Sequence, residues 1–118
     1  MKNLSFPGLP RVLIVDDEDV VREGLRTLLQ HEGLHVETAG TAEEGLRRAS
    51  GRSFDIVLLD QNLPGLDGLS SISEFRQGTP SADILLLAGY GAVANTVESM
   101  RKGASEVIEK PFSSDRIM

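Results

Sequence analysis

Four ionisable residues follow short apolar runs in this sequence: Asp16, Asp17, Asp60 and Lys110. Carboxylates brought close together repel one another unless a cation lies among them. A hard divalent ion with oxygen ligands, most simply Mg²⁺, meets that need with few carboxylates and several waters. A nearby lysine offers a compact positive charge to an incoming phosphate. These groups predict phosphoryl transfer to a carboxylate, with Asp60 as the nucleophile and with the metal and Lys110 stabilising the developing charge.

Two of the apolar runs explain how the acids are positioned. Ile56–Leu59 is an unbroken apolar run too short for a helix, and turn-forming residues follow it from 62 to 68. We therefore expect a buried central strand that carries Asp60 to its C-terminal edge, where open parallel α/β sheets bind their ligands. Arg11–Val15 is a second apolar strand, and it delivers the other two acids in the same way.

Strands and helices are expected to alternate five times along the chain. The expected strands are Arg11–Val15, His35–Ala39, Ile56–Leu59, Asp83–Ala88 and Glu106–Glu109. The first expected helix is Glu18–His31, with Val21, Leu25 and Leu28 on one face. A Thr41–Glu44 capping box opens the second, which turns Ala42, Leu46 and Ala49 inward. The third carries Leu69, Ile72 and Phe75 on one face, the fourth carries Val93, Val97 and Met100, and the fifth begins at Ser113 and is truncated. This alternation predicts a doubly wound parallel sheet with helices on both faces.

Composition limits the classes of function. A chain of 118 residues allows one domain, which we place at 11–118 behind a short leader at 1–10. The absence of cysteine excludes a disulfide scaffold and a thiolate site, and it is compatible with a cytoplasmic location. A net charge of −6 without a basic patch argues against direct binding of nucleic acid. No segment has the pattern of a signal peptide or of a membrane span.

Three motifs, in this order and spacing, resemble the receiver domain of two-component response regulators. They are D-D at 16–17, D-Q-N-L-P-G-L-D-G at 60–68 and E-K-P-F at 109–112. The resemblance runs from Arg11 almost to the end of the chain. It implies a flavodoxin-like fold with strand order 2-1-3-4-5, and a signalling domain, not an enzyme with a separate substrate, that is phosphorylated on Asp60 by a sensor histidine kinase.

The resemblance also implies roles for individual residues. Mg²⁺ would be held by Asp17, Asp60 and the backbone carbonyl of Asn62, with Asp16 acting through a metal-bound water and Lys110 contacting the phosphoryl group. An output domain or partner would be addressed through the face of the fourth helix, fifth strand and fifth helix, and a homodimer is compatible with this pattern. Residues 89–112 are similar to receivers of nitrogen-regulation-type transcription activators, which implies control of transcription.

Two positions depart from the family pattern and concern how phosphorylation is transmitted. Ala88 stands where the family has Ser or Thr at the end of the fourth strand, and Val107 stands where it has an aromatic residue. Tyr90 is either an exposed loop residue or a lid beside the phosphate site. An alternative function is therefore a pseudo-receiver, a protein-interaction module with phosphate-independent or rewired output.

An enzyme of another class is the remaining alternative. Phosphatases with an aspartyl nucleophile resemble D-x-D at the strand end, whereas here Gln61 and Asn62 follow Asp60. The glycines at 89 and 91 belong to no phosphate-binding loop motif, and His31 and His35 lack the company of other metal ligands.

Overall fold

The computed structural model describes residues 9–51, 53–61, 63, 68–88, 101, 103–104 and 106–109. Its elements, in chain order, are β1 (Arg11–Val15), α1 (Asp19–His31), β2 (His35–Ala39), α2 (Ala42–Gly51), β3 (Ile56–Asp60), α3 (Gly68–Gly78), β4 (Asp83–Ala88) and β5 (Glu106–Glu109). The expected fourth and fifth helices and the 1–10 leader, apart from residues 9 and 10, lie outside this part of the chain.

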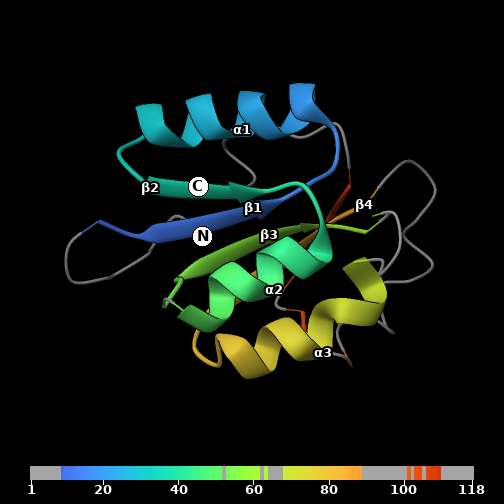
Figure 1. Ribbon diagram of the computed structural model, residues 1–118. Coiled ribbons are helices and arrows are strands. Elements are labelled where there is room, and N and C mark those ends of the chain that lie inside the picture. The colour runs from blue at the N-terminus through green and yellow to red at the C-terminus, as the bar shows by residue number, and fades with distance from the viewer. Residues whose placement is uncertain are drawn as a thin grey trace.

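The strands form one parallel sheet in the order β2-β1-β3-β4-β5. Helix α1 covers one face of the sheet, and α2 and α3 cover the other (Figure 1). The predicted flavodoxin-like α/β architecture with a parallel sheet is therefore confirmed. Because β3 lies between β1 and β4, its C-terminal residue Asp60 emerges near the middle of the sheet edge.

Alternating strand residues fill two separate cores, one on each face of the sheet. Leu13, Val57 and Leu86 belong to the core under α2 and α3, which includes Ile72 and Phe75. Their sequence neighbours on the strands point to the opposite core, under α1. This two-sided burial is the reason why the strands read as continuous apolar runs instead of alternating ones.

The buried face of α1 differs slightly from the predicted one. We expected Leu28 to face the core beside Leu25, but the fully buried residue is Leu29, and Leu28 is only partly buried. Both leucines are compatible with helical spacing from Leu25, so the direction in which the helix crosses the sheet decides between them. The helix also begins at Asp19, with Glu18 as its N-cap.

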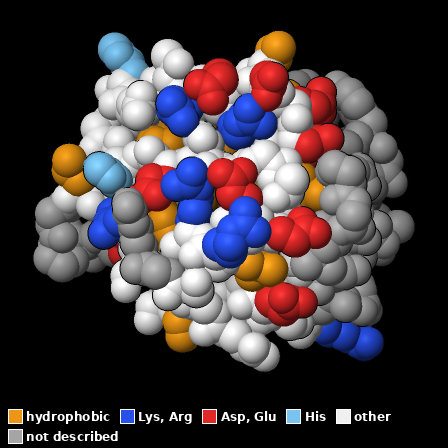
Figure 2. Space-filling view, in the orientation of Figure 1, with side chains coloured by type: hydrophobic (Ala, Val, Ile, Leu, Met, Phe, Trp, Pro, Cys, Tyr) orange, Lys and Arg blue, Asp and Glu red, His pale blue; other side chains and the backbone are white. Residues whose placement is uncertain are grey.

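Strand β2 lies at the edge of the sheet, and charged side chains flank it. Glu37 forms ion pairs with Arg11 of β1 and with Arg48 of α2, each at 3.4 Å. Figure 2 shows acidic and basic side chains interspersed over this face of the molecule. Such charges discourage edge-to-edge pairing with another sheet.

Within the described residues, no helix combines the length and apolarity needed to cross a bilayer.

Helix α2 begins with a variant of the predicted capping box. The Thr41 hydroxyl accepts a hydrogen bond from the Glu44 N–H at 3.0 Å, as expected. The Glu44 carboxylate reaches back one residue further than the motif requires and accepts the Gly40 N–H at 2.9 Å. This backbone hydrogen bond, with help from the Arg48 guanidinium, lowers the pKa of Glu44 from its ordinary value. The ionised carboxylate therefore fastens the end of β2 to the start of α2.

We predict that Glu44→Gln destabilises the protein at neutral pH but not in acid. A carboxyl group whose pKa is lower in the folded state stabilises above its unfolded pKa, and that contribution disappears as pH falls through the folded value. The parent and variant curves of unfolding free energy against pH should therefore converge on acidification. Denaturant unfolding measures both curves. Glu43→Gln, the same charge change on the neighbouring exposed residue, should show a smaller gap, and equal gaps would contradict the assignment.

Gly45 lets α2 approach the sheet beside the acidic residues. A Cβ atom at this position would lie 2.9 Å from Val15 Cγ2 and 3.0 Å from Phe75 Cζ. Both neighbours are fully buried, so neither side chain can move aside freely. Val15 directly precedes Asp16, so the close packing of α2 also fixes where that acid leaves the strand.

We predict opposite effects of alanine at two helical glycines. Gly45→Ala should destabilise the protein, because overpacking costs roughly 1–3 kcal/mol and outweighs a helix-propensity gain of about 1 kcal/mol. Gly24→Ala in α1 meets no atom within 4 Å and should stabilise by up to about 1 kcal/mol. Thermal or denaturant unfolding gives both signs. A stabilised Gly45→Ala would show that α2 is not held against Val15.

Candidate functional site

Asp16, Asp17 and Asp60 come together at the C-terminal edge of the sheet, as the sequence predicts. Each offers a carboxylate oxygen, and these oxygens all lie within 4.8 Å of one another. The parallel register brings this about, because Val15 of β1 pairs with Leu59 of β3 and the next residue of each strand is an acid. Asp16 is completely buried and Asp60 is 4% exposed, whereas Asp17 is exposed.

Backbone hydrogen bonds fix the loop that carries Asp16. Its N–H donates to the Ala39 carbonyl at 3.1 Å, which extends the pairing of β1 with β2 by one residue. Its Oδ1 accepts the Glu18 N–H at 2.9 Å, one of the N–H groups that the start of α1 leaves unpaired. The carboxylate therefore contributes to the helix start as well as to the acidic cluster.

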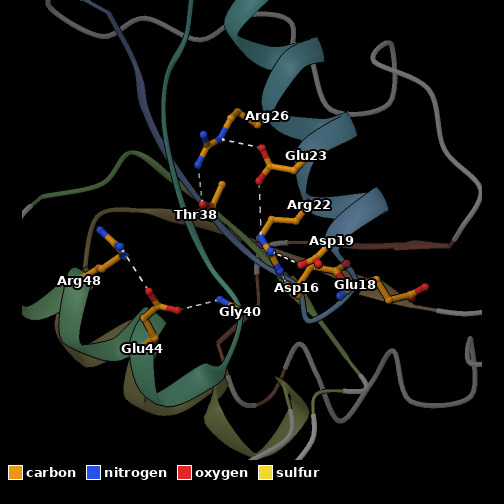
Figure 3. A network of polar contacts seen from close by, with 10 residues as sticks. All are labelled: Asp16, Glu18, Asp19, Arg22, Glu23, Arg26, Thr38, Gly40, Glu44 and Arg48. Carbon is orange, nitrogen blue, oxygen red and sulfur yellow. Dashed lines mark hydrogen bonds and ion pairs between the residues drawn. The ribbon is translucent and has the colours of Figure 1, made fainter.

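Arg22 is a residue of this site that the sequence reasoning missed. Its Nη1 donates to the backbone carbonyl of Asp16 at 2.9 Å, and its Nη2 pairs with Asp19 (Figure 3). The spacing of Asp19 and Arg22 indicates only an ordinary ion pair on the first turn of a helix. The contact with the Asp16 carbonyl is visible only in the folded chain, where it holds the loop between β1 and α1 against the helix.

The buried pairing of β3 with β4 holds Asp60. Asp60 is the last residue of β3 and pairs with Leu87, and the next residue donates its N–H to the Leu87 carbonyl at 2.9 Å. The strand thus ends on Asp60, as the sequence predicts. A carboxylate held by a strand that is paired on both sides has a fixed position relative to the neighbouring acids.

The donor set fits a hard divalent cation. All three side chains of the cluster offer carboxylate oxygen, which Ca²⁺ and Mg²⁺ prefer. Three negative charges this close repel one another, and a divalent ion relieves that repulsion. The exposed position of Asp17 leaves access for water, which such ions retain in part.

The remaining predicted site residues do not belong to the cluster of three acids. Asn62, Tyr90 and Lys110 lie outside the residues that the structure describes. Ala88 is the last residue of β4 and pairs with Glu109, so it ends its strand at the same edge as Asp60. Val107 lies within β5 and pairs with Leu86.

With this geometry established, comparison with known proteins identifies the family. Residues 12–118 match the family model of the response regulator receiver domain. The chain belongs to this family, and it is the receiver domain of a two-component response regulator, as the three motifs indicated.

Relatives support this assignment but are longer than the chain. The transcriptional activator protein PfeR of Pseudomonas aeruginosa is 37% identical over 113 residues, which cover 94% of this chain and 36% of PfeR. The transcriptional regulatory protein FixJ of Bradyrhizobium diazoefficiens is 34% identical over 106 residues, which cover 90% of this chain and 52% of FixJ. The chain thus spans about a third to a half of these curated relatives.

Solved structures agree with the fold. A response regulator from Burkholderia pseudomallei, described with a phosphorylated aspartic acid, a calcium ion and citrate, matches with a TM-score of 0.87 at 30% identity over 92% of this chain and 64% of its own. The receiver domain of NtrX from Brucella abortus matches with a TM-score of 0.83 at 35% identity over 90% of both chains.

We predict that Asp17→Asn weakens divalent-cation binding at the cluster by about tenfold or more, because a charged ligand at such a site contributes at least about 1.4 kcal/mol. The exposed side chain makes this change compatible with folding. Titration with Mg²⁺ or Ca²⁺, followed by amide NMR, measures the affinity. Glu18→Gln removes the same charge from the adjacent exposed residue outside the cluster, and it should change the affinity much less. Equal losses would mean that only the general field of the acids matters.

Proposed function

We propose that this receiver domain accepts a phosphoryl group on Asp60 from a sensor histidine kinase, with Mg²⁺ bound at the acidic cluster. The observation that carries the proposal is the convergence of three carboxylate oxygens within 4.8 Å at the end of the buried strand β3. The phosphorylated aspartic acid and calcium ion of the Burkholderia pseudomallei relative support it by analogy.

The proposed step transfers phosphorus from nitrogen to oxygen. A carboxylate oxygen of Asp60 attacks the phosphorus of a phosphohistidine, the P–N bond breaks, and the imidazole leaves with the electron pair, giving an aspartyl phosphate. Asp17, Asp60 and the Asn62 carbonyl would hold Mg²⁺, with Asp16 acting through a water. When bound, the ion neutralises part of the charge on the phosphoryl oxygens, and Lys110 would contact the same oxygens.

The relatives suggest what the whole protein does, beyond the phosphorylation of its receiver domain. The named relatives are transcriptional activators and regulators of which this chain covers only a part. We therefore propose that residues 11–118 act in the cytoplasm as a phosphorylation-controlled unit. They would govern an output domain or partner through the surface formed by the fourth helix, β5 and the fifth helix, as a monomer or a homodimer. Regulation of transcription is the expected outcome.

A pseudo-receiver remains the second candidate because of Ala88. This residue ends β4 at the same edge as Asp60, and alanine carries no hydroxyl to bond a phosphoryl oxygen. A hydrogen bond to a charged group contributes about 1.5–3 kcal/mol, enough to shift a two-state equilibrium by tenfold or more. Phosphorylation without such a bond should change the shape of the domain less than it does in receivers with Ser or Thr.

We predict that a small-molecule phosphodonor with Mg²⁺ adds one phosphoryl group per chain, on Asp60. Intact-mass measurement should show this gain in the parent and in Asp19→Asn, a nearby exposed acid outside the cluster, but not in Asp60→Asn. A gain that persists in Asp60→Asn would place the chemistry elsewhere, and no gain in the parent would favour the pseudo-receiver.

Hydrogen exchange of the phosphorylated parent then tests the output. We expect a small change around β4 and β5 in the parent and a larger one in Ala88→Thr. A full-sized change in the parent would show that another group has taken over the role of the missing hydroxyl.

A further inference from the structure

A hollow of about 360 Å³ lies at the end of β2, between α1 and α2. Three arginines from the two helices line it: Arg22 and Arg26 from α1, and Arg48 from α2. Thr38 and Gly40 form its side along β2. Figure 3 shows Arg48 and Glu44 on α2 opposite the arginines of α1, with the end of β2 between them. In a chain with a net charge of −6, a hollow with three guanidinium groups stands out.

The guanidinium groups are ordered by neighbours that occupy only part of their donors. Arg22 is held by the Asp16 carbonyl and Asp19, and Arg26 Nη2 donates to the Thr38 hydroxyl at 2.8 Å. A guanidinium carries five N–H donors, and these contacts use few of them. Side chains already fixed in this way lose little conformational entropy when they bind a ligand.

Two glutamates also line the hollow, but they hold the arginines loosely. Glu44 lies 3.3 Å from Arg48 Nη2, and Glu23 lies 3.6 Å from Arg26 Nε and 3.8 Å from Arg22 Nε. Charge-assisted N–H···O bonds are typically about 2.7–2.9 Å long. The Arg26 Nε is moreover buried without a hydrogen-bond partner among the described residues. The neighbours of Arg26 thus leave part of its hydrogen-bonding capacity unmet.

We propose that this hollow binds a small doubly charged oxyanion of the phosphate class. Planar guanidinium groups match the oxygens of such an anion and are weakly hydrated, so they bind it better than ammonium groups do. Three arginines and two glutamates line the hollow, and the carboxylates of Asp19 and Glu37 pair with Arg22 and Arg48 beside it, so binding depends on the unused guanidinium donors and not on a net positive charge. Exposed ion pairs contribute only about 0–1 kcal/mol each, so the glutamates compete weakly with a dianion.

This site is separate from the phosphoacceptor cluster but adjacent to it. Arg22 lines the hollow and at the same time donates to the backbone carbonyl of Asp16. An anion drawn to Arg22 would thus bind next to the loop that carries the first acid of the cluster. The proposal does not depend on phosphorylation of Asp60, and it holds in the absence of any divalent ion.

The test is an amide and arginine side-chain NMR titration without divalent cations, using sodium phosphate and sodium sulfate. Sodium chloride at matched ionic strength is the reference, because it reproduces the screening without the oxyanion. We expect saturable shifts at Thr38, Gly40 and the Nε–H signals of the lining arginines with phosphate and sulfate, and not with chloride. Shifts that do not saturate, or that chloride reproduces, would overturn the proposal.

Variants distinguish the site from general charge attraction. Arg48→Gln and Arg26→Gln should each weaken phosphate binding by about tenfold, the effect of losing a hydrogen bond to a charged group. Arg47→Gln removes the same charge from the adjacent exposed residue, which does not line the hollow, and should leave the affinity within about twofold. Equal weakening by Arg47→Gln and Arg48→Gln would refute a built site. Binding that survives both Arg26→Gln and Arg48→Gln would do the same.

Discussion

The burial of β3 on both faces is the constraint on which the rest of the structure depends. Ile56, Val57, Leu58 and Leu59 are all inaccessible to solvent, and β1 and β4 pair with the two edges of the strand. An unpaired charge in the middle of such a strand would be far too costly, so the acid stands at the end of the strand, beside the other two acids. Parallel pairing then forces the ends of β1 and β3 to the same edge. The acidic cluster is thus a consequence of how the core is built.

A second set of interactions shapes the surroundings of that cluster without contributing much to stability. Asp16 serves the start of α1 through the Glu18 N–H, and Arg22 holds the Asp16 carbonyl. From Arg22 the polar network continues through Glu23 to Arg26 and Thr38. The exposed ion pairs with Glu23 are individually weak beside the burial of a single leucine. Their effect is geometric, since they fix the direction in which α1 leaves the sheet and the orientation of the arginines beside β2.

Membership of the receiver family explains why the chain keeps a cluster of mutually repelling acids at all. Carboxylates that repel one another at such a site favour a bound cation, because the cation relieves the repulsion. The departures from the family lie on β4 and β5, at Ala88 and Val107, and not in the acids themselves. The acids of the cluster thus follow β1 and β3, whereas the two departures from the family pattern lie on β4 and β5.

The sequence by itself determined the described helices and strands and the meeting of the three acids. Apolar runs and helical spacing are local signals, and the shared edge of parallel strands turns the positions of Asp16, Asp17 and Asp60 in the chain into proximity in space. The tertiary structure alone decided that Leu29 and not Leu28 is buried. It decided that Val15 and Phe75 pack closely against Gly45. It also decided that the Glu44 carboxylate accepts the Gly40 N–H. It also decided that Arg22 meets the Asp16 carbonyl and that arginines of α1 and α2 share one hollow. Each of these depends on the angle and distance at which packed elements cross, and no pattern within a single segment encodes that geometry.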